Sequence, residues 1–246
     1  QPDPLAFLIL LFPVLIINIP MSALRQAAAI GLVCVALTSF LDRRLLRFVS
    51  WIVLASGFHS SAGIFLLLAP LVRGAYTRNR LVLAGLFALP GAYLIASGGD
   101  AELAMSRYVD SGRDALGAAY RAGVLFLSGL LFTLFLRREW LRRFAHDYKL
   151  ASLGAMMMLA TLPLVAFSTI IADRVGYYFI PIQAVIFARI PYLVAGQWGR
   201  LLTVIPYIGL SLLLIVWMFT SKLFDQCYMP YQTWLLGFPA SLRYIY

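Results

Sequence analysis

The sequence predicts an all-α, polytopic transmembrane helix bundle, and three observations support this class. Of the 246 residues, 62% are hydrophobic and only 12% are charged, whereas soluble domains are about half apolar and a quarter charged. The apolar residues form long runs, and a spanning helix needs about 20 of them. The basic residues gather between the runs, where they set the orientation of a membrane protein. No internal repeat or low-complexity linker is visible, so we expect residues 1–246 to be one membrane domain. Because the chain begins inside a hydrophobic region, we expect it to be the C-terminal part of a longer protein.

The formal net charge of +10 narrows the range of partners. In a soluble protein such a charge would suggest nucleic acid, but here the cations lie at the ends of apolar runs, so we expect no nucleic-acid partner. Cys34 and Cys227 are far apart, and no cluster of His, Cys, Asp and Glu has the spacing of metal ligands. We therefore expect no disulfide, no metal and no cofactor.

The apolar runs predict the membrane segments in order. The first run, residues 5–19, is interrupted by Pro13 and is either a whole tilted span or the end of one. Further runs cover residues 22–41, 48–72, 81–96, 124–136, 150–171, 175–194 and 201–220. A polar loop at residues 97–123 separates the fourth run from the fifth, and a polar, aromatic tail follows the last.

Basic loops at residues 42–47, 73–80 and 137–149 predict a common cytoplasmic face. Only the run at residues 48–72 separates the first two of these loops, and one straight span would put them on opposite faces. We therefore expect a broken, re-entrant hairpin over residues 48–72, with its junction at "GFHSSAG" (residues 57–63). The alternative is one tilted helix of 25 residues whose flanking arginines break the charge rule.

Each half of such a hairpin has about 11 residues and a length of about 16 Å. The junction would then lie within the bilayer or just short of its far face. Irregular backbone is tolerated at that depth only where protein or a water-filled cavity surrounds it. A membrane-embedded site is therefore expected at this junction.

This topology leaves several arginines on the outer face, where arginine is normally scarce. They are Arg25, Arg107, Arg113, Arg121, Arg174 and Arg243. Positive charge in that position suggests a bound anion, and arginine suits bidentate contact with phosphate. Ser22 is expected to cap a helix whose first turn carries Arg25 and Gln26, and a helix N-terminus favours anions. The alternative for Arg25 is a side chain that only reaches toward the membrane surface.

Two further groups carry candidate chemistry. His59, beside Ser60 and Ser61, is either a hydrogen-bonded structural residue or a general base or donor, because ionisable groups inside membranes tend to be functional. No acid lies nearby in the sequence, so a serine-hydrolase triad is not supported. In "ADRVGYYFIP", Asp173 and Arg174 either form a local ion pair within an aromatic belt, or Arg174 holds phosphate while Tyr177 and Tyr178 stack on sugar rings.

Several of these motifs together resemble the EpsG family of bacterial exopolysaccharide polymerases, which is related to the Wzy O-antigen polymerases. The Arg25–Gln26 helix start and the element Phe58-His59-Ser60-Ser61-Ala62 match the family's Arg-Gln and Phe-His-x-Ser-Ala motifs. "ADRVGYYFIP" is similar to the family's Arg followed by Tyr-Phe, and "CYMPYQTWL" looks like its terminal Tyr-x-Pro-Tyr segment. Tyr228, Pro230 and Tyr231 carry that last segment. Family members also have N-terminal spans with an acidic outer loop, which are not in this sequence, so a general base from that part cannot be named.

The resemblance implies a GT-C-like bundle and a metal-independent glycosyltransferase. It would join undecaprenyl-pyrophosphate-linked oligosaccharide repeat units into exopolysaccharide or O-antigen, at the outer, periplasmic face of the bacterial inner membrane. Arg25 and Arg174 would hold the pyrophosphate leaving group, and His59 would orient or deprotonate the acceptor hydroxyl. The expected substrate-binding residues are Gln26, Ser60, Arg107, Tyr177, Tyr178 and Tyr231. Membrane lipid, a chain-length regulator and export proteins would be partners.

Two alternatives stay open at this point. An O-antigen ligase would use the same donor with a lipid A core acceptor. A transporter or flippase would move the same lipid-linked glycan without releasing undecaprenyl pyrophosphate.

Overall fold

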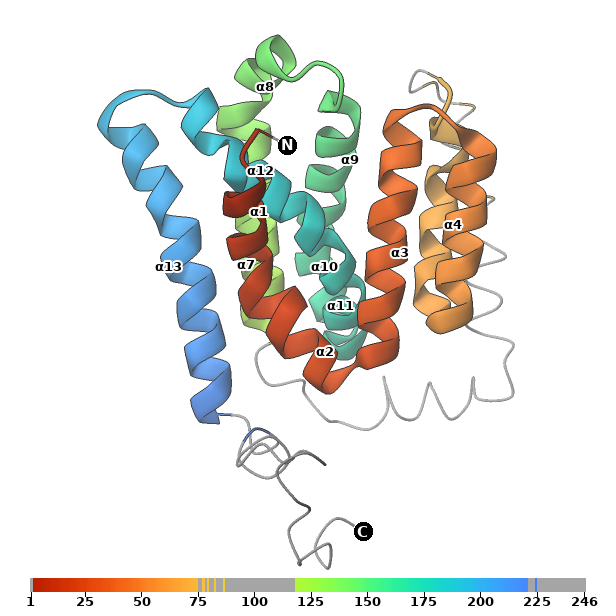
Figure 1. Ribbon diagram of the computed structural model, residues 1–246, viewed down its shortest axis with the longest axis horizontal. Helices are drawn as coiled ribbons and strands as arrows, with labels where there is room; N and C mark the ends of the chain where they lie inside the picture. The colour runs from red at the N-terminus through yellow and green to blue at the C-terminus, as the bar shows by residue number, and fades with distance from the viewer. Residues whose placement is uncertain are drawn as a thin grey trace, which may run out of the picture.

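The computed structural model describes residues 2–74 and 118–220, together with a few single positions outside these ranges. All elements in the described part are helical (Figure 1). Four of its helices are long and apolar enough to cross a membrane: Leu24–Leu41, Ala119–Arg143, Tyr148–Ala166 and Gly199–Thr220. The predicted all-α, polytopic membrane protein is thus confirmed. The apolar run at 81–96 lies outside the described residues.

The N-terminal run forms α1 (Pro4–Leu11), a π-helical segment (Phe12–Asn18) and α2 (Ile19–Ser22). Pro13 does not break this run, because the backbone widens into the π-helical turn that begins beside it. The chain then reverses at Ala23, which has φ −149° and ψ 62°, and α3 (Leu24–Leu41) runs back along the bundle (Figure 1). The predicted cap at Ser22 is wrong, because Ser22 ends α2 and Ala23 precedes α3. Arg25 and Gln26 do occupy the first turn of α3, as predicted.

The predicted broken hairpin is confirmed. α4 (Leu45–Phe58) ends at His59, whose backbone is extended with φ −151° and ψ 115°, and a 3₁₀ helix, η2 (Ser60–Leu71), follows. Arg73, just after η2, lines the same cavity as Arg43, Arg44 and Arg47 before and within the start of α4. Both feet of the hairpin therefore lie at one end of the bundle, and the single tilted helix is excluded.

The second half of the chain begins with α7 (Ala118–Leu131), which continues through a π-helical segment (Phe132–Leu136) into α8 (Arg137–Arg143). The expected start of this span at residue 124 was too late. Arg121 lies inside α7. Its charge does not need to be exposed in a loop, because it is paired with the carboxylate of Asp173. After a turn, the chain enters α9 (Tyr148–Leu159) and α10 (Thr161–Phe167).

The predicted run at residues 150–171 does not form one helix. Ser168 is extended, with φ −160° and ψ 119°, and its side chain accepts the backbone N–H of Ile171, so it caps a new helix, α11 (Thr169–Gly176). A 3₁₀ turn (Tyr177–Phe179) leads into α12 (Ile180–Leu193), and α13 (Gly196–Thr220) ends the described part.

Packing places α12 at the centre of the bundle and α13 at its edge (Figure 1). Eleven of the fourteen residues of α12 are buried, whereas only 11% of the apolar window of α13 is. Small residues allow close approach to α9: a Cβ atom on Gly154 would lie 2.5 Å from Ile182, and one on Gly129 would lie 2.7 Å from the carbonyl oxygen of Ala155. Such small residues are typical of helix contacts in membranes, where backbones pack closely.

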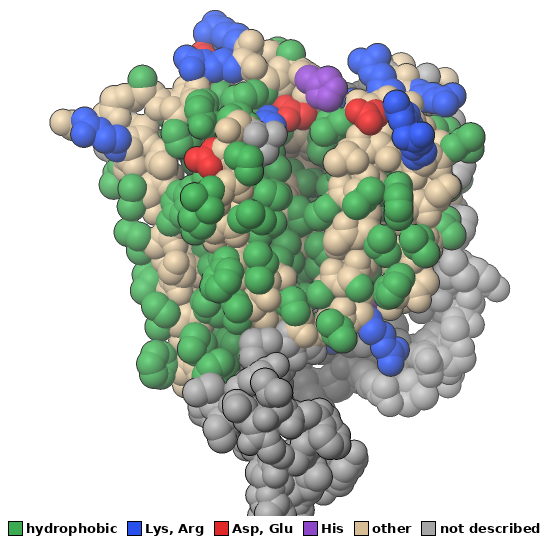
Figure 2. Space-filling view, viewed as in Figure 1, with side chains coloured by type: hydrophobic (Ala, Val, Ile, Leu, Met, Phe, Trp, Pro, Cys, Tyr) green, Lys and Arg blue, Asp and Glu red, His purple; other side chains and the backbone are tan. Residues whose placement is uncertain are grey.

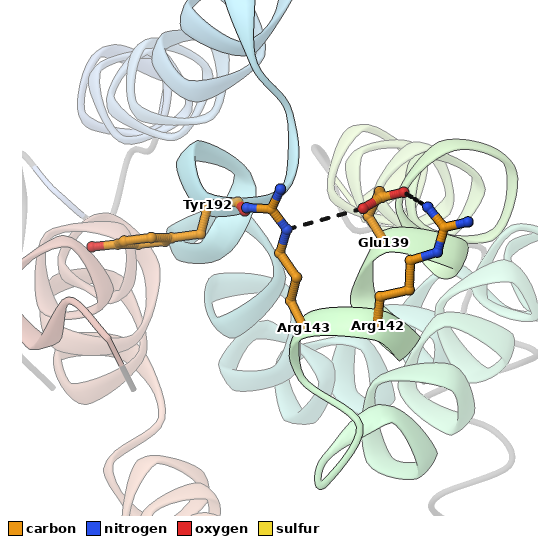
Figure 3. A network of polar contacts seen from close by, with 4 residues as sticks. All are labelled: Glu139, Arg142, Arg143 and Tyr192. Carbon is orange, nitrogen blue, oxygen red and sulfur yellow. Dashed lines mark hydrogen bonds and ion pairs between the residues drawn. The ribbon is translucent and has the colours of Figure 1, made fainter.

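Lysine and arginine side chains gather at one end, which we call the basic end, above a surface that is largely hydrophobic (Figure 2). There Arg142 and Arg143 share Glu139, and Arg143 also donates to the carbonyl oxygen of Tyr192, which ties α8 to α12 (Figure 3). Lys149 donates to the carbonyl oxygens of Leu71 and Gly74, and so holds the end of η2 against α9.

A buried ion pair lies just below this surface. Arg189 contacts Asp147 at 2.5 Å, and its guanidinium stacks over Trp140 and Phe144 at 4.9 and 4.4 Å from the ring centroids. Trp140 donates to the same Asp147 carboxylate at 3.1 Å. Burial of an ion pair requires such additional contacts, because each charge loses its hydration.

Candidate active site

At the end of the bundle opposite the basic end, three turns converge: the start of α3, the junction of the α4–η2 hairpin, and the passage from α11 into α12. Gln26, fully buried, joins the first of these to the third. Its amide nitrogen donates to the carbonyl oxygen of Arg174 at 2.7 Å, and its amide oxygen accepts from the Arg174 guanidinium at 3.3 Å. One buried amide thus fixes both the backbone and the side chain of Arg174.

The hairpin junction carries a chain of three polar side chains. His59 Nδ1 lies 2.6 Å from Ser61 Oγ, and Ser61 Oγ lies 3.0 Å from the hydroxyl of Tyr178. The extended backbone at His59 makes this possible, because it turns the imidazole back toward the first residues of η2. Tyr178 has no exposed surface and packs on Phe65, with ring centroids 5.5 Å apart. The chain therefore links the half-buried His59 to the bundle interior.

Two arginines act electrostatically on this histidine. Arg174 and Arg25 both lie close enough for their charges to act on the imidazole of His59. Arg25 is exposed and Arg174 is half-buried. In the part of the chain that the structure describes, neither forms an ion pair with a carboxylate. Two cations without a counter-charge beside an ionisable ring make a site that favours an anion.

Asp173 does not pair with its neighbour Arg174, because adjacent residues on a helix point in different directions. Instead its carboxylate contacts Arg121 Nε of α7 at 2.6 Å, and the Arg121 guanidinium lies over the ring of Tyr177, 5.4 Å from the centroid. The local ion pair considered from the sequence is therefore absent. Its place is taken by a contact across 52 residues, which leaves the Arg174 guanidinium facing Gln26 and the site.

A sequence model of the EpsG family matches residues 1–233. The chain belongs to the EpsG family. Searches of curated proteins and of solved structures returned no match. The EpsG family is associated with polysaccharide polymerisation, which implies a lipid-linked saccharide as substrate in general. Together with the apolar helices, this makes the chain a membrane protein of polysaccharide biosynthesis.

In this EpsG protein, the two motifs of the N-terminal half meet the same partner. Gln26 binds Arg174 directly, and His59 lies within the field of that arginine. Residues about 30 and 150 positions apart in the sequence are thereby brought together. The catalytic roles of Arg25, His59 and Arg174 stay predictions.

The predicted substrate-binding residues differ in how exposed they are, and two of them lie outside the described residues. Ser60 is exposed at the junction, but it is Ser61, grouped with His59 from the sequence but not expected to bind substrate, that contacts His59. Tyr177 and Tyr178 are both buried, so stacking of either ring on a sugar requires present contacts to open. Arg107 and Tyr231 lie outside the described residues. Within the described part, no group of three or more His, Cys, Asp and Glu side chains is placed to hold a metal ion.

The sequence also did not single out the Arg121–Asp173 pair as a pair. A signal was available, since "ADR" provides one acid next to one base and Arg121 stands at the edge of an apolar run. What the sequence lacks is the spatial neighbourhood of α7 and α11, which decides the partner of Asp173.

Proposed function

We propose that this protein is a polymerase that joins undecaprenyl-pyrophosphate-linked oligosaccharide repeat units into exopolysaccharide or O-antigen. The observation that carries the proposal is the position of His59, at a break between two half-helices, beside two arginines without a carboxylate partner in the described part. A pyrophosphate leaving group needs cations, and an acceptor hydroxyl needs a base. Both are supplied within one site.

In the proposed reaction, the oxygen of an acceptor sugar hydroxyl forms a bond to the anomeric carbon of the donor glycan. The bond from that carbon to the pyrophosphate oxygen breaks, and its electron pair leaves with undecaprenyl pyrophosphate. Arg25 and Arg174 stabilise the negative charge that develops on this leaving group, which a site with little water makes more effective. No metal ion is required for this step, because the arginines supply the positive charge.

His59 takes the proton of the acceptor hydroxyl in this proposal. When Nδ1 carries a proton and donates to Ser61 Oγ, the lone pair is on Nε2, which then serves as the base. Ser61 in turn donates to the hydroxyl of the buried Tyr178. Ser61 and Tyr178 are therefore positioning residues that hold the imidazole, and Gln26 does the same for Arg174.

The side of the membrane follows from the charges. The basic end collects Arg43, Arg44, Arg47 and Arg73, and the candidate site lies at the other end. Because basic loops stay in the cytoplasm, the proposed site faces the outside of the bacterial inner membrane. Lipid-linked repeat units would then be joined at that face, with chain-length and export proteins acting on the product.

The test uses the purified chain in liposomes with a lipid-linked repeat unit and no lipid A core acceptor. Polymer length is read on gels, and released undecaprenyl pyrophosphate is measured. The variants are Arg25→Gln, His59→Ala and Arg174→Gln, and the control is Arg138→Gln at the basic end. Each site variant is expected to lower the rate by about 10²–10³-fold, and the control to leave it unchanged.

Three outcomes would contradict the proposal. Long chains from all three site variants, with normal insertion, would exclude the assigned residues. Chain growth that requires core acceptor would indicate a ligase. Movement of the glycan lipid without release of undecaprenyl pyrophosphate would indicate a transporter.

A further inference from the structure

At the basic end, a cavity opens between the two feet of the hairpin. It is wide open to the surroundings, is lined by Arg43, Arg44, Leu46, Arg47 and Arg73, and has a volume of about 430 Å³. Of the described residues that line it, four are arginines, one is a leucine and none is acidic. The α3–α4 turn supplies Arg43 and Arg44, the first turn of α4 supplies Arg47, and the turn after η2 supplies Arg73.

These four arginines differ from others at the same end. Arg142 and Arg143 share the carboxylate of Glu139 (Figure 3), and Arg189 pairs with Asp147. Among the described residues, no carboxylate lies within ion-pair distance of any arginine that lines the cavity. Like charges collected around one cavity repel one another, and an anion between them would relieve that repulsion.

The backbone at this cavity is also unusual. Arg43 has φ +58°, and it is the only non-glycine residue with positive φ in the described part of the chain. Arg43 follows the C-cap of α3, and the backbone N–H groups of Arg43 and Arg44 donate to the carbonyl oxygens of Phe40 and Ser39, as in a Schellman helix end. This helix end turns the chain so that Arg43 and Arg44, together with Arg47 in the first turn of α4, line one cavity.

We propose that this cavity binds the phosphate headgroup of an anionic phospholipid from the leaflet at the basic end. A lipid is favoured over a soluble anion because Leu46, 78% exposed, lines the cavity beside the cations. An apolar side chain at that place gives the acyl chains a contact while the arginines hold the phosphate. Clusters of basic residues at the end of membrane helices attract anionic lipids by the same charge complementarity.

The bound headgroup would join the two feet of the hairpin. One side of the cavity is the start of α4, and the other follows the end of η2. Lys149 already holds the carbonyl oxygens at that end of η2. The lipid would add a further tie between this end of η2 and α4, and so stabilise the hairpin whose junction carries His59. The inference does not depend on the reaction proposed above, since it concerns binding.

The experiment measures phosphatidylglycerol bound to the purified full chain in a neutral detergent, by native mass spectrometry and by thermal unfolding. The variant is Arg44→Gln/Arg47→Gln/Arg73→Gln, which leaves Arg43 in place. The control, Arg137→Gln/Arg138→Gln/Arg200→Gln, removes the same charge from exposed positions outside the cavity. We expect the variant to raise the dissociation constant by at least about tenfold, and the control to change it by less than about twofold.

Several results would overturn the proposal. Equal losses in the variant and the control would reduce the effect to general surface charge. Phosphatidylcholine bound as tightly as phosphatidylglycerol would exclude recognition of net charge. Inorganic phosphate that stabilises the chain as fully as the lipid would identify a soluble anion as the ligand. If the triple variant does not fold, Arg73→Gln alone leaves the α3–α4 turn intact, and an unchanged dissociation constant in that variant would also refute the site.

Discussion

Replacement of Ser61 by alanine tests the polar chain at the hairpin junction most directly. Ser61 Oγ is the atom between His59 Nδ1, at 2.6 Å, and the Tyr178 hydroxyl, at 3.0 Å. Without it, both neighbours lose a partner. Tyr178 has no exposed surface, so water cannot replace the lost contact in the present conformation.

The lost contact of Tyr178 affects stability, and the lost contact of His59 affects the reaction rate. An orphaned buried hydroxyl costs about 1–3 kcal/mol of stability, and this is the loss expected for Ser61→Ala. His59 would keep its place in the chain but lose the group that holds its ring, and misplacement of a catalytic group lowers rates by about ten- to hundredfold. Tyr178→Phe removes the far end only, so we expect a stability loss of about 0.5–1.5 kcal/mol and a rate within about threefold of the wild type.

The assay combines thermal unfolding in detergent with the polymer-length measurement in liposomes. The double variant Ser61→Ala/Tyr178→Phe removes the orphaned hydroxyl together with its partner, so its stability should exceed that of Ser61→Ala while its rate stays equally low. Ser61→Thr, which keeps a hydroxyl, should restore most of the rate.

Two results would refute the reasoning. If the double variant regains rate along with stability, then Ser61 acts only on the fold and does not position His59. If Ser61→Ala leaves both stability and rate unchanged, then the hydroxyl does not connect His59 to Tyr178.

Three further predictions concern contacts of this protein other than those of His59, Ser61 and Tyr178. Gly154→Leu should lower stability in thermal unfolding by about 1–3 kcal/mol, because its side chain would enter the α9–α12 contact, whereas Gly31→Ala, in open space, should not. Gln26→Glu should lower the polymerisation rate, because a carboxylate would neutralise the arginine it contacts, and it should also lower stability, because the donor to the Arg174 carbonyl oxygen is lost; an unchanged rate would contradict this. Arg189→Met should cost about 3–5 kcal/mol by leaving Asp147 unpaired, and Asp147→Asn in the same chain should recover part of that loss.

The hairpin could be predicted from the sequence because the prediction requires only a count of the basic residues on either side of one apolar run. Arginines before and after one apolar run violate the charge rule unless the run turns back, and Arg43 and Arg73 do line one cavity. The rule needs no knowledge of neighbours in space. The position of the break could also be read, since His59 is the polar residue that interrupts the hydrocarbon.

Local backbone geometry was less predictable. Ser22 looked like a helix cap, but a cap depends on the dihedral angles of the residue, and Ala23 adopts them instead. The sequence did not predict the break at Ser168, because the residues next to it are apolar or carry only a hydroxyl group. Serine is nevertheless a favoured N-cap, and Ser168 caps the start of α11.

The partners of the site residues could not be read at all. Asp173 contacts Arg121 and Gln26 contacts Arg174, at separations of 52 and 148 residues. Which acid meets which base is decided by how α7, α11 and α3 pack, and apolar periodicity fixes only that each is a helix. The sequence therefore predicted which types of residue lie at the candidate site. It did not predict which of them contact one another and which are left to contact a substrate.

The shortness of the two hairpin legs makes membrane thickness a variable of the proposed reaction. The 14 residues of α4 rise about 21 Å and the 12 residues of η2 about 24 Å, whereas the hydrocarbon layer is about 30 Å thick. If the feet lie at one surface of the hydrocarbon layer, as proposed, His59 would end about 6–9 Å below the other. A lipid pyrophosphate must descend by that distance, or the bilayer must thin around the protein, at a fraction of a kcal/mol for each ångström. A cell that shortens or lengthens its acyl chains would thereby also adjust how easily this site meets its substrate.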